Sequence, residues 1–178
     1  NNNFEPPQMR SFLLQEGVRP ASILAVTFTN KAAEEIKNRV AESSHLAKFV
    51  HIGTFHSLCV RWLREFAHAL GFTADFTIFD DSDSLAAIKQ IIKELQMSTE
   101  DTTPKEFKNA IQRAKTAGLS PADARRQQVS YFPAGGMRIY EAYQTYLAKC
   151  NAMDFNDLLG NMLNLLRHHE DVRTTLQN

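Results

Sequence analysis

The chain has 178 residues, and its 20 Lys and Arg balance its 20 Asp and Glu, so the formal net charge is zero. Apolar residues make up 43% and charged residues 22%, which is typical of a globular protein and excludes a disordered chain. Zero net charge argues against coating of nucleic acid by bulk electrostatics, but it leaves room for a local site.

Nothing in the sequence indicates a membrane partner. No apolar run reaches the length of a membrane span, and the chain does not open on a signal peptide. The two cysteines, Cys59 and Cys150, lie far apart in the sequence, which favours reduced thiols. We therefore expect a cytoplasmic protein.

The first third of the chain predicts a βαβ unit. After a short helical stretch at residues 9–15, residues 23–28 form a continuous apolar run that fits a strand buried on both faces of a parallel sheet. Residues 31–40 predict a helix capped by Asn30, and residues 49–53 predict a second strand. Because two parallel strands are not stable alone, we expect further strands from a larger α/β protein.

From Ser57 onward, apolar residues recur at helical spacing. A short apolar piece at residues 76–79 interrupts this pattern. Three tyrosines, Tyr140, Tyr143 and Tyr146, follow the helical spacing, which favours packing over a stacking platform. Cap and turn signals separate the predicted helices; they stand at Gly71, Asp80, Gly118, Ser120, Gly135 and Asp154.

The two predicted strands end in a similar way. Each runs into a hydroxyl, an aromatic ring and a polar side chain just before a helix; the two stretches are Thr27-Phe28-Thr29-Asn30 and Thr54-Phe55-His56-Ser57. Ligands of parallel α/β sheets bind at the carboxyl ends of strands, where helix N-termini offer free N–H groups to anions. An aromatic ring at that edge adds a stacking surface, which suits a nucleic-acid single strand. The alternative is that Phe28 and Phe55 are core residues and the threonines are simple helix caps.

These stretches are parts of longer motifs that resemble a known family. Residues 25–36 closely resemble motif Ia of the UvrD/Rep family of superfamily 1 DNA helicases, and residues 52–58 resemble motif Ib. Residues 75–81 resemble the start of the helical insertion of the first motor domain, and residues 153–159 resemble the return from it. The four matches come in the family's order and cover most of residues 20–178.

The resemblance implies a motor that uses ATP and Mg²⁺ to move along single-stranded DNA and to unwind duplex, with single-strand/duplex junctions as further partners. The implied fold is α/β: a partial RecA-like P-loop NTPase core with a mostly helical inserted subdomain. Residues 1–66 would belong to the motor domain, 67–151 to the insertion and 152–178 to the return segment. His56 would be a DNA-backbone contact or a hinge packing residue. The motifs place along the single strand Thr27, Phe28, Thr29, Asn30, Lys31, Thr54, Phe55 and His56.

The family's nucleotide site is missing from this sequence. Its phosphate loop, Gly-x-x-x-x-Gly-Lys-Ser/Thr, should precede the first strand, but no Gly-Lys pair occurs. The family's apolar strand that ends in Asp-Glu is also absent. Phe79-Asp80-Asp81 resembles the end of such a strand, but apolar residues at helical spacing follow directly, which favours a helix cap at this position. We therefore expect a fragment that has no catalytic or ATP-binding residues and is inactive alone.

Two further interpretations remain open. The segment 105–126 carries six cations against two carboxylates, and these cations either contact duplex phosphates or form a solvated helix face; they are Lys105, Lys108, Arg113, Lys115, Arg125 and Arg126. The second interpretation concerns the whole chain, which could be a stand-alone helical DNA-binding or protein-interaction module without a motor. The six histidines lack ligand-like spacing with the cysteines, so we expect no metal site.

Overall fold

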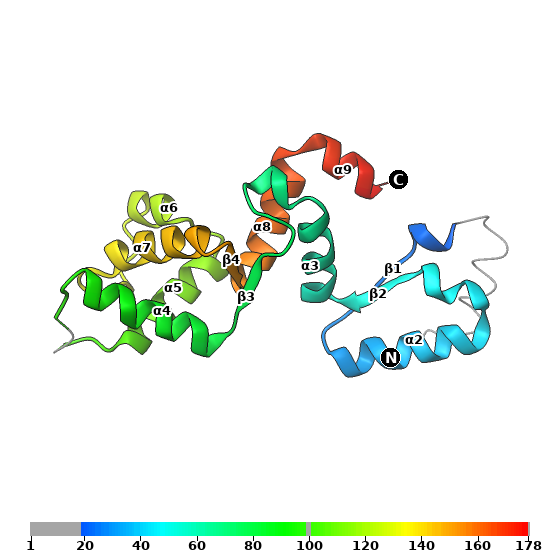
Figure 1. Cartoon of the computed structure of the whole chain (residues 1–178), viewed down its shortest axis with the longest axis horizontal. Helices are drawn as coiled ribbons and strands as arrows, with labels where there is room; N and C mark the ends of the chain where they lie inside the picture. The colour runs from blue at the N-terminus through cyan, green and yellow to red at the C-terminus, as the bar shows by residue number, and fades with distance from the viewer. Residues whose placement is uncertain (1–18, 99–100, 178) are drawn as a thin grey trace. The chain divides into compact units, whose positions relative to one another are not determined.

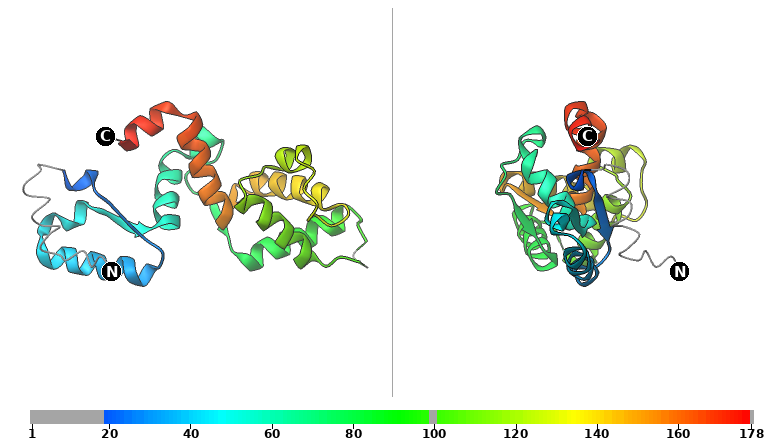
Figure 2. Two further views of the ribbon diagram at one scale, coloured as in Figure 1. Left: turned by 180° about the vertical axis from the view of Figure 1, so that it is seen from behind. Right: turned by 90° about the vertical axis from the view of Figure 1, so that its right-hand side faces the viewer.

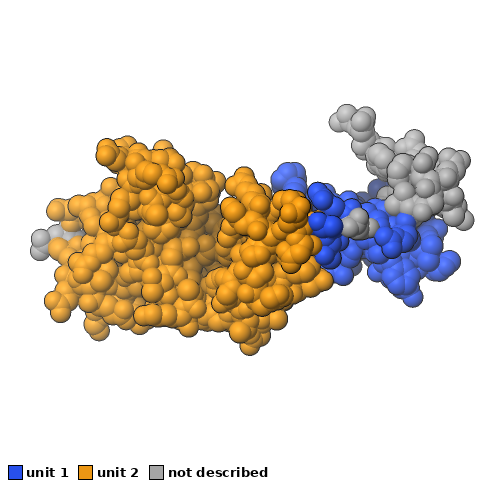
Figure 3. Space-filling model, turned by 90° about the horizontal axis from the view of Figure 1, so that it is seen from above, with its two compact units in different colours: residues 1–61, 174–178 blue, residues 62–173 orange. Residues whose placement is uncertain are grey.

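The structure is a computed structural model that describes residues 19–98 and 101–177 (Figure 1). The helix predicted at residues 9–15 lies outside the described residues. The chain divides into two compact units, residues 1–61 with 174–178 and residues 62–173 (Figure 3). The described part is a mixed α/β structure, mostly helical, with two small parallel sheets, which confirms the predicted class in outline.

The first unit contains the predicted βαβ order. Its elements are a 3-10 turn (Pro20–Ser22), β1 (Leu24–Thr27), α2 (Asn30–Ser43), a second 3-10 turn (His45–Phe49), β2 (His51–Thr54) and the start of α3 (Phe55–Glu65). Strand β1 pairs with β2 in parallel, and α2 packs against both strands (Figure 1). The apolar face of α2 that makes this contact includes Ala33 and Val40, which are both buried.

Two details of this unit differ from the sequence prediction. The first strand is not buried on both faces: Leu24 is half-exposed, because the described part of this sheet has only two strands and leaves one surface open. The cap of α2 is Thr29 rather than Asn30. Thr29 has extended backbone geometry and its Oγ1 accepts a hydrogen bond from the N–H of Ala32 at 3.1 Å, so Asn30 is already the first helical residue.

The second unit is built mainly from helices. Its elements are the end of α3, a 3-10 turn (Ala67–Leu70), β3 (Thr77–Phe79), α4 (Asp81–Glu94), α5 (Pro104–Thr116), α6 (Pro121–Arg126), α7 (Gly136–Lys149), β4 (Ala152–Asp154) and α8 (Phe155–His168). Helix α9 (Glu170–Gln177) follows α8. Helices α4, α5 and α7 pack around one hydrophobic core. Figure 2 shows the ribbon of these helices from behind. Tyr140 and Tyr143 are buried in that core, so their predicted packing role is confirmed.

Local cap chemistry explains where these helices begin and end. The caps predicted at Asp80, Ser120 and Asp154 are confirmed: each side chain accepts a backbone N–H of the first turn, and an acidic residue three positions later completes a capping box. Thr103 forms the same motif before α5. Asp80 is therefore a helix cap. The predicted break at Gly135 is also confirmed, since its φ of 74° lies in the left-handed region that favours glycine.

The pairing of β3 with β4 was not predicted. Thr77, Ile78 and Phe79 align in parallel with Ala152, Met153 and Asp154, so paired strands lead into and out of helices α4 to α7. The side chain of Asn151 reinforces the junction: its Oδ1 accepts the backbone N–H of Thr73 at 3.0 Å. Strands of three residues are too short to show a period of two, which is why the sequence indicated only an apolar piece.

A buried polar cluster joins α5 to the start of α8. The Lys115 ammonium, with 4% of the side chain exposed, donates to Asp154 Oδ2 at 2.6 Å and Asp157 Oδ2 at 2.8 Å. The Tyr143 hydroxyl lies 3.1 Å from the same Asp154 oxygen and 2.9 Å from Ser84 Oγ. Burial raises the pKa of the Asp157 carboxyl above its usual range, although the adjacent Lys115 opposes the shift.

Both cysteines are free thiols, Cys59 buried and Cys150 exposed, as expected. In the described ranges no helix is both long and apolar enough to cross a lipid bilayer.

Candidate nucleic-acid interface

The register of β1 and β2 brings the two similar strand ends together. Thr27 pairs with Thr54, the last residue of each strand. The residues that follow, Phe28 and Phe55, therefore lie side by side, with ring centroids 5.7 Å apart and an angle of 52° between the ring planes. The sequence predicted similar chemistry at the two strand ends, and the register places the two rings in one aromatic pair.

Both rings face solvent. The exposed fraction is 89% for Phe28 and 49% for Phe55. Within the described chain Phe28 therefore does not belong to a core, and Phe55 is about half-covered. Apolar side chains of this size gain free energy from burial, so an exposed pair at a sheet edge offers a ready stacking surface for planar ligands.

Two helix N-termini open at the same edge of the sheet. Helix α2 begins at Asn30 and α3 begins at Phe55, and neither has an acidic residue in its first turn. In contrast, α4, α5, α6 and α8 each carry an acidic residue in the first turn as part of a capping box. The partial positive charge at the starts of α2 and α3 is therefore not neutralised by a local carboxylate, which favours an anion there.

The threonines at this edge serve partly as helix caps, as the alternative interpretation held. Thr54 is buried, and its Oγ1 accepts the N–H of Ser57 at 3.2 Å. Thr29 caps α2 in the same way but is exposed. Thr27 is half-buried at the end of β1. Thr54 is thus suited to hold the start of α3, while the other two hydroxyls lie nearer to solvent.

The polar residues that follow the rings differ in exposure. Asn30 and Lys31 are exposed in the first turn of α2, and His56 is half-buried in α3. Gly53 lies close to the first turn of α3: a Cβ at this position would lie 2.6 Å from Ser57 Oγ and 3.2 Å from Leu58 Cγ, so a larger residue would require these side chains to shift. The role of this glycine follows from the approach of strand to helix, which the sequence alone does not show.

The six cations of residues 105–126 do not form one surface. Lys115 is buried between Asp154 and Asp157, and the largely buried ammonium of Lys108 lies 3.0 Å from Asp81 Oδ2. Both ammonium groups are therefore already paired with carboxylates and largely withdrawn from solvent, which disfavours a contact of these two lysines with duplex phosphates.

The other four cations are exposed, but two of them already have acidic partners. Arg125 pairs with Glu141 at 2.5 Å and Arg126 with Asp123 at 2.6 Å. Arg113 lies instead over the ring of Tyr131, with its guanidinium carbon 4.3 Å from the ring centroid. Tyr131 was not singled out by the sequence, because it lies in an aperiodic loop between α6 and α7.

Metal binding finds no support in the described ranges, where no three His, Cys, Asp or Glu side chains gather as a metal ion would require.

Comparison with known proteins decides the family. Residues 8–178 match the UvrD/REP helicase N-terminal domain. The chain belongs to this family. It is 36% identical over 170 residues to the ATP-dependent DNA helicase PcrA of Staphylococcus aureus (strain Mu50), and 36% identical over 173 residues to the protein of the same name from Staphylococcus epidermidis (strain RP62A). Each alignment covers 94% of this chain but 23% of the relative, so the chain spans about a quarter of the length of these curated relatives.

Proposed function

We propose that the chain acts as part of an ATP-dependent DNA helicase and contributes contacts to single-stranded DNA. Membership of the UvrD/REP helicase family and the similarity to PcrA support the proposal. The observation that carries it is the exposed pair of Phe28 and Phe55 beside two helix N-termini without a neutralising acid. Stacking rings next to anion sites are the two components that single-strand binding needs.

Each residue of the edge has a role in this proposal. Phe28 and Phe55 stack on successive bases. The N–H groups at the starts of α2 and α3, with the exposed side chains of Asn30 and Lys31, contact phosphates. Thr27, Thr29 and His56 flank the path of the strand, and Thr54 holds the end of β2 to α3.

The proposed organisation follows the resemblance in sequence. Residues 1–66 belong to a RecA-like motor domain, 67–151 form an inserted subdomain and 152–178 return to the motor domain, which acts at single-strand/duplex junctions. ATP and Mg²⁺ serve the whole motor. Among the cations of residues 105–126, exposure and pairing favour Lys105 and Arg113 as duplex contacts.

The Phe28→Ala variant is expected to bind a single-stranded oligothymidylate more weakly by about 1–3 kcal/mol, the usual worth of one base–aromatic stack. The salt dependence of binding should barely change, because no phosphate contact is lost. Lys31→Ala should do the reverse and lower the salt slope by about one unit. Fluorescence anisotropy at several salt concentrations measures both quantities.

Stability separates this role from a structural one. Since the Phe28 ring is 89% exposed, Phe28→Ala should leave the urea midpoint of the chain nearly unchanged. A variant that melts much earlier and binds the oligonucleotide normally would contradict the proposal, as would a wild-type chain that binds no single strand.

We further expect that these 178 residues alone bind no ATP. The reason is the missing Gly-Lys loop, whose backbone N–H groups and lysine hold the phosphates in P-loop proteins. Isothermal titration with Mg-ATP should give only heats of dilution. Saturable binding at micromolar ATP would show that the nucleotide site is formed by other residues of this chain.

A further inference from the structure

The chain passes twice between the end of α3 with α8, on one side, and helices α4 to α7, on the other. The first crossing is formed by residues 72–80 and contains β3, and the second is formed by residues 150–154 and contains β4. The two strands pair in parallel and lie side by side in Figure 1. Both crossings belong to the second unit, residues 62–173, and neither takes part in the proposed contacts to DNA.

Arg64, in the last turn of α3, holds the first crossing from one side. Its Nη1 donates to the carbonyl oxygen of Ala74 at 2.7 Å and its Nη2 to the carbonyl oxygen of Phe76 at 3.4 Å. The guanidinium carbon lies 4.8 Å from the centroid of the Phe76 ring, and that ring is buried. Because the ring and the two carbonyls order a side chain that otherwise has many rotamers, the end of α3 is tied firmly to the first crossing.

Asn151 holds the same stretch from the second crossing. Its Oδ1 accepts the backbone N–H of Thr73 at 3.0 Å, and its Nδ2 donates to the Thr73 hydroxyl at 2.5 Å. Its backbone carbonyl accepts the N–H of Thr77 at 2.9 Å. The φ of Asn151 is 48°, in the left-handed region that asparagine adopts more readily than most residues. This backbone conformation after α7 therefore directs both the side chain and the carbonyl of one residue toward the first crossing.

The structure on either side of the crossings does not depend on them alone. Helices α4, α5 and α7 share a hydrophobic core of their own, so they need not unfold when the crossings separate. A second tie between the two sides is the buried cluster in which Lys115 of α5 contacts Asp154 and Asp157 at the start of α8. Three pairs of residues in β3 and β4 add little by themselves, because a two-stranded sheet of this size is marginal in water.

We propose that Arg64 and Asn151 form a clasp on the first crossing, and that opening of this clasp lets helices α4 to α7 tilt as one body about the buried Lys115 cluster. Hinges of this kind need only a few residues at the ends of elements to change conformation, and both crossings are such places. When the clasp is closed, the helices follow the end of α3 and α8. The inference concerns the second unit by itself and does not rest on DNA binding.

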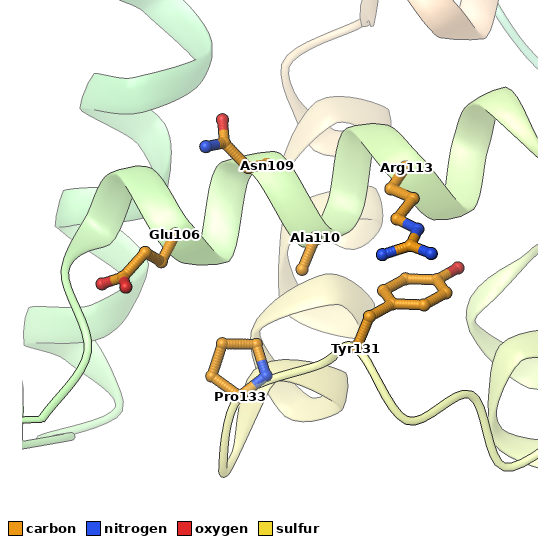
Figure 4. Close-up of a pocket in the computed structure, with 6 residues that line it drawn as sticks. All are labelled: Glu106, Asn109, Ala110, Arg113, Tyr131 and Pro133. Atoms are coloured by element: carbon orange, nitrogen blue, oxygen red, sulfur yellow. The ribbon is translucent and has the colours of Figure 1, made fainter.

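Hydrogen exchange followed by NMR tests the clasp at the amides that it protects. Asn151→Gly keeps a residue that adopts positive φ but removes the side-chain amide, so the N–H groups of Thr73 and Thr77 should exchange about tenfold faster. The N–H of Ile111, in the core of α5, should change less than about twofold. Asn109→Ala is the matched control: Asn109 is an exposed asparagine of α5 beside an open pocket (Figure 4), and its loss should leave both crossings unchanged.

Distances between two spin labels measure the tilt itself. The labels are attached through Lys89→Cys in α4 and Asn164→Cys in α8, two exposed positions, after Cys150→Ser has removed the exposed native thiol. This background should give one narrow distance distribution, and Asn151→Gly or Arg64→Gln should each broaden it about twofold.

Two further measurements make the comparison sharp. Arg64→Lys keeps the charge but loses the planar fork that reaches two carbonyls, so its distribution should lie between those of the wild type and Arg64→Gln. Trp62, the single tryptophan of the chain, belongs to the same unit, and its urea transition shows that each variant is folded.

Three results would overturn the proposal. Equal acceleration of the Thr73 and Ile111 amides would mean that Asn151 only adds stability to the whole unit. Faster exchange at Thr73 with an unchanged label distance would mean that the contact protects the strands without holding the helices. A wild-type distance distribution as broad as that of the variants would mean that the clasp does not hold. None of these measurements uses DNA, so each of these failures leaves the proposed single-strand interface standing.

Discussion

Replacing Lys115 with alanine is expected to lower the free energy of unfolding of the second unit by about 3–5 kcal/mol. The substitution removes the one ammonium that lies between Asp154 and Asp157, 2.6 and 2.8 Å from their carboxylate oxygens. Two carboxylates would then remain in a site that is almost closed to water. Removing one partner of a buried ion pair costs more than the pair itself contributes, because the remaining charge keeps its desolvation penalty.

Urea unfolding followed by Trp62 fluorescence measures this loss. Arg126→Ala is the matched control. Arg126 pairs with Asp123, three residues earlier in the chain, but its side chain is exposed to solvent, so loss of this ion pair should cost about 1 kcal/mol or less. Adding Asp157→Asn to the Lys115→Ala variant should restore part of the stability, because one buried charge disappears. A Lys115→Ala chain as stable as the control would show that the cluster is open to water.

Phe107→Ala is expected to destabilise the same unit by about 3–5 kcal/mol, the cost of emptying a large site in a core. The ring of Phe107 is 1% exposed and belongs to the core that α4, α5 and α7 share. Phe155→Ala makes the identical chemical change where the ring is 52% exposed, and its cost should be about 1 kcal/mol or less.

The comparison of the two phenylalanines tests the assignment of the core. The stability losses of both variants are measured from the same unfolding transition of Trp62 fluorescence, so effects of the substitution on the unfolded state largely cancel. Equal losses would mean that α5 does not pack as described, and a larger loss for Phe155 would place the core on α8 instead.

The sequence predicted the local features of this chain well, because they depend on neighbouring residues. Helix caps at Asp80, Ser120 and Asp154 need only a side chain and the backbone of the next turn, and all three caps were predicted. The same holds for the break at Gly135 and for the order strand, helix, strand in the first unit. The shift of the α2 cap from Asn30 to Thr29 is an error of one residue within that local pattern.

The candidate site was predicted in part. Similar stretches after two strands indicated one edge of a parallel sheet, and the register of Thr27 with Thr54 confirms that the strand ends meet. Whether Phe28 belongs to the core or faces solvent could not be decided from the sequence, because a phenylalanine after a strand is compatible with both.

The sequence by itself determined most of the helices, the caps at Asp80, Ser120 and Asp154, the βαβ order and the motifs that identify the helicase family, since each depends on residues close together in the chain. Only the tertiary structure decided which charged side chains are buried in ion pairs and which stay exposed. Lys115 and Arg113 stand two residues apart on one helix, yet the first is buried between two aspartates and the second lies exposed over a tyrosine. Burial and charge pairing depend on partners 18 to 42 positions away, and for these contacts the chain carries no periodic signal.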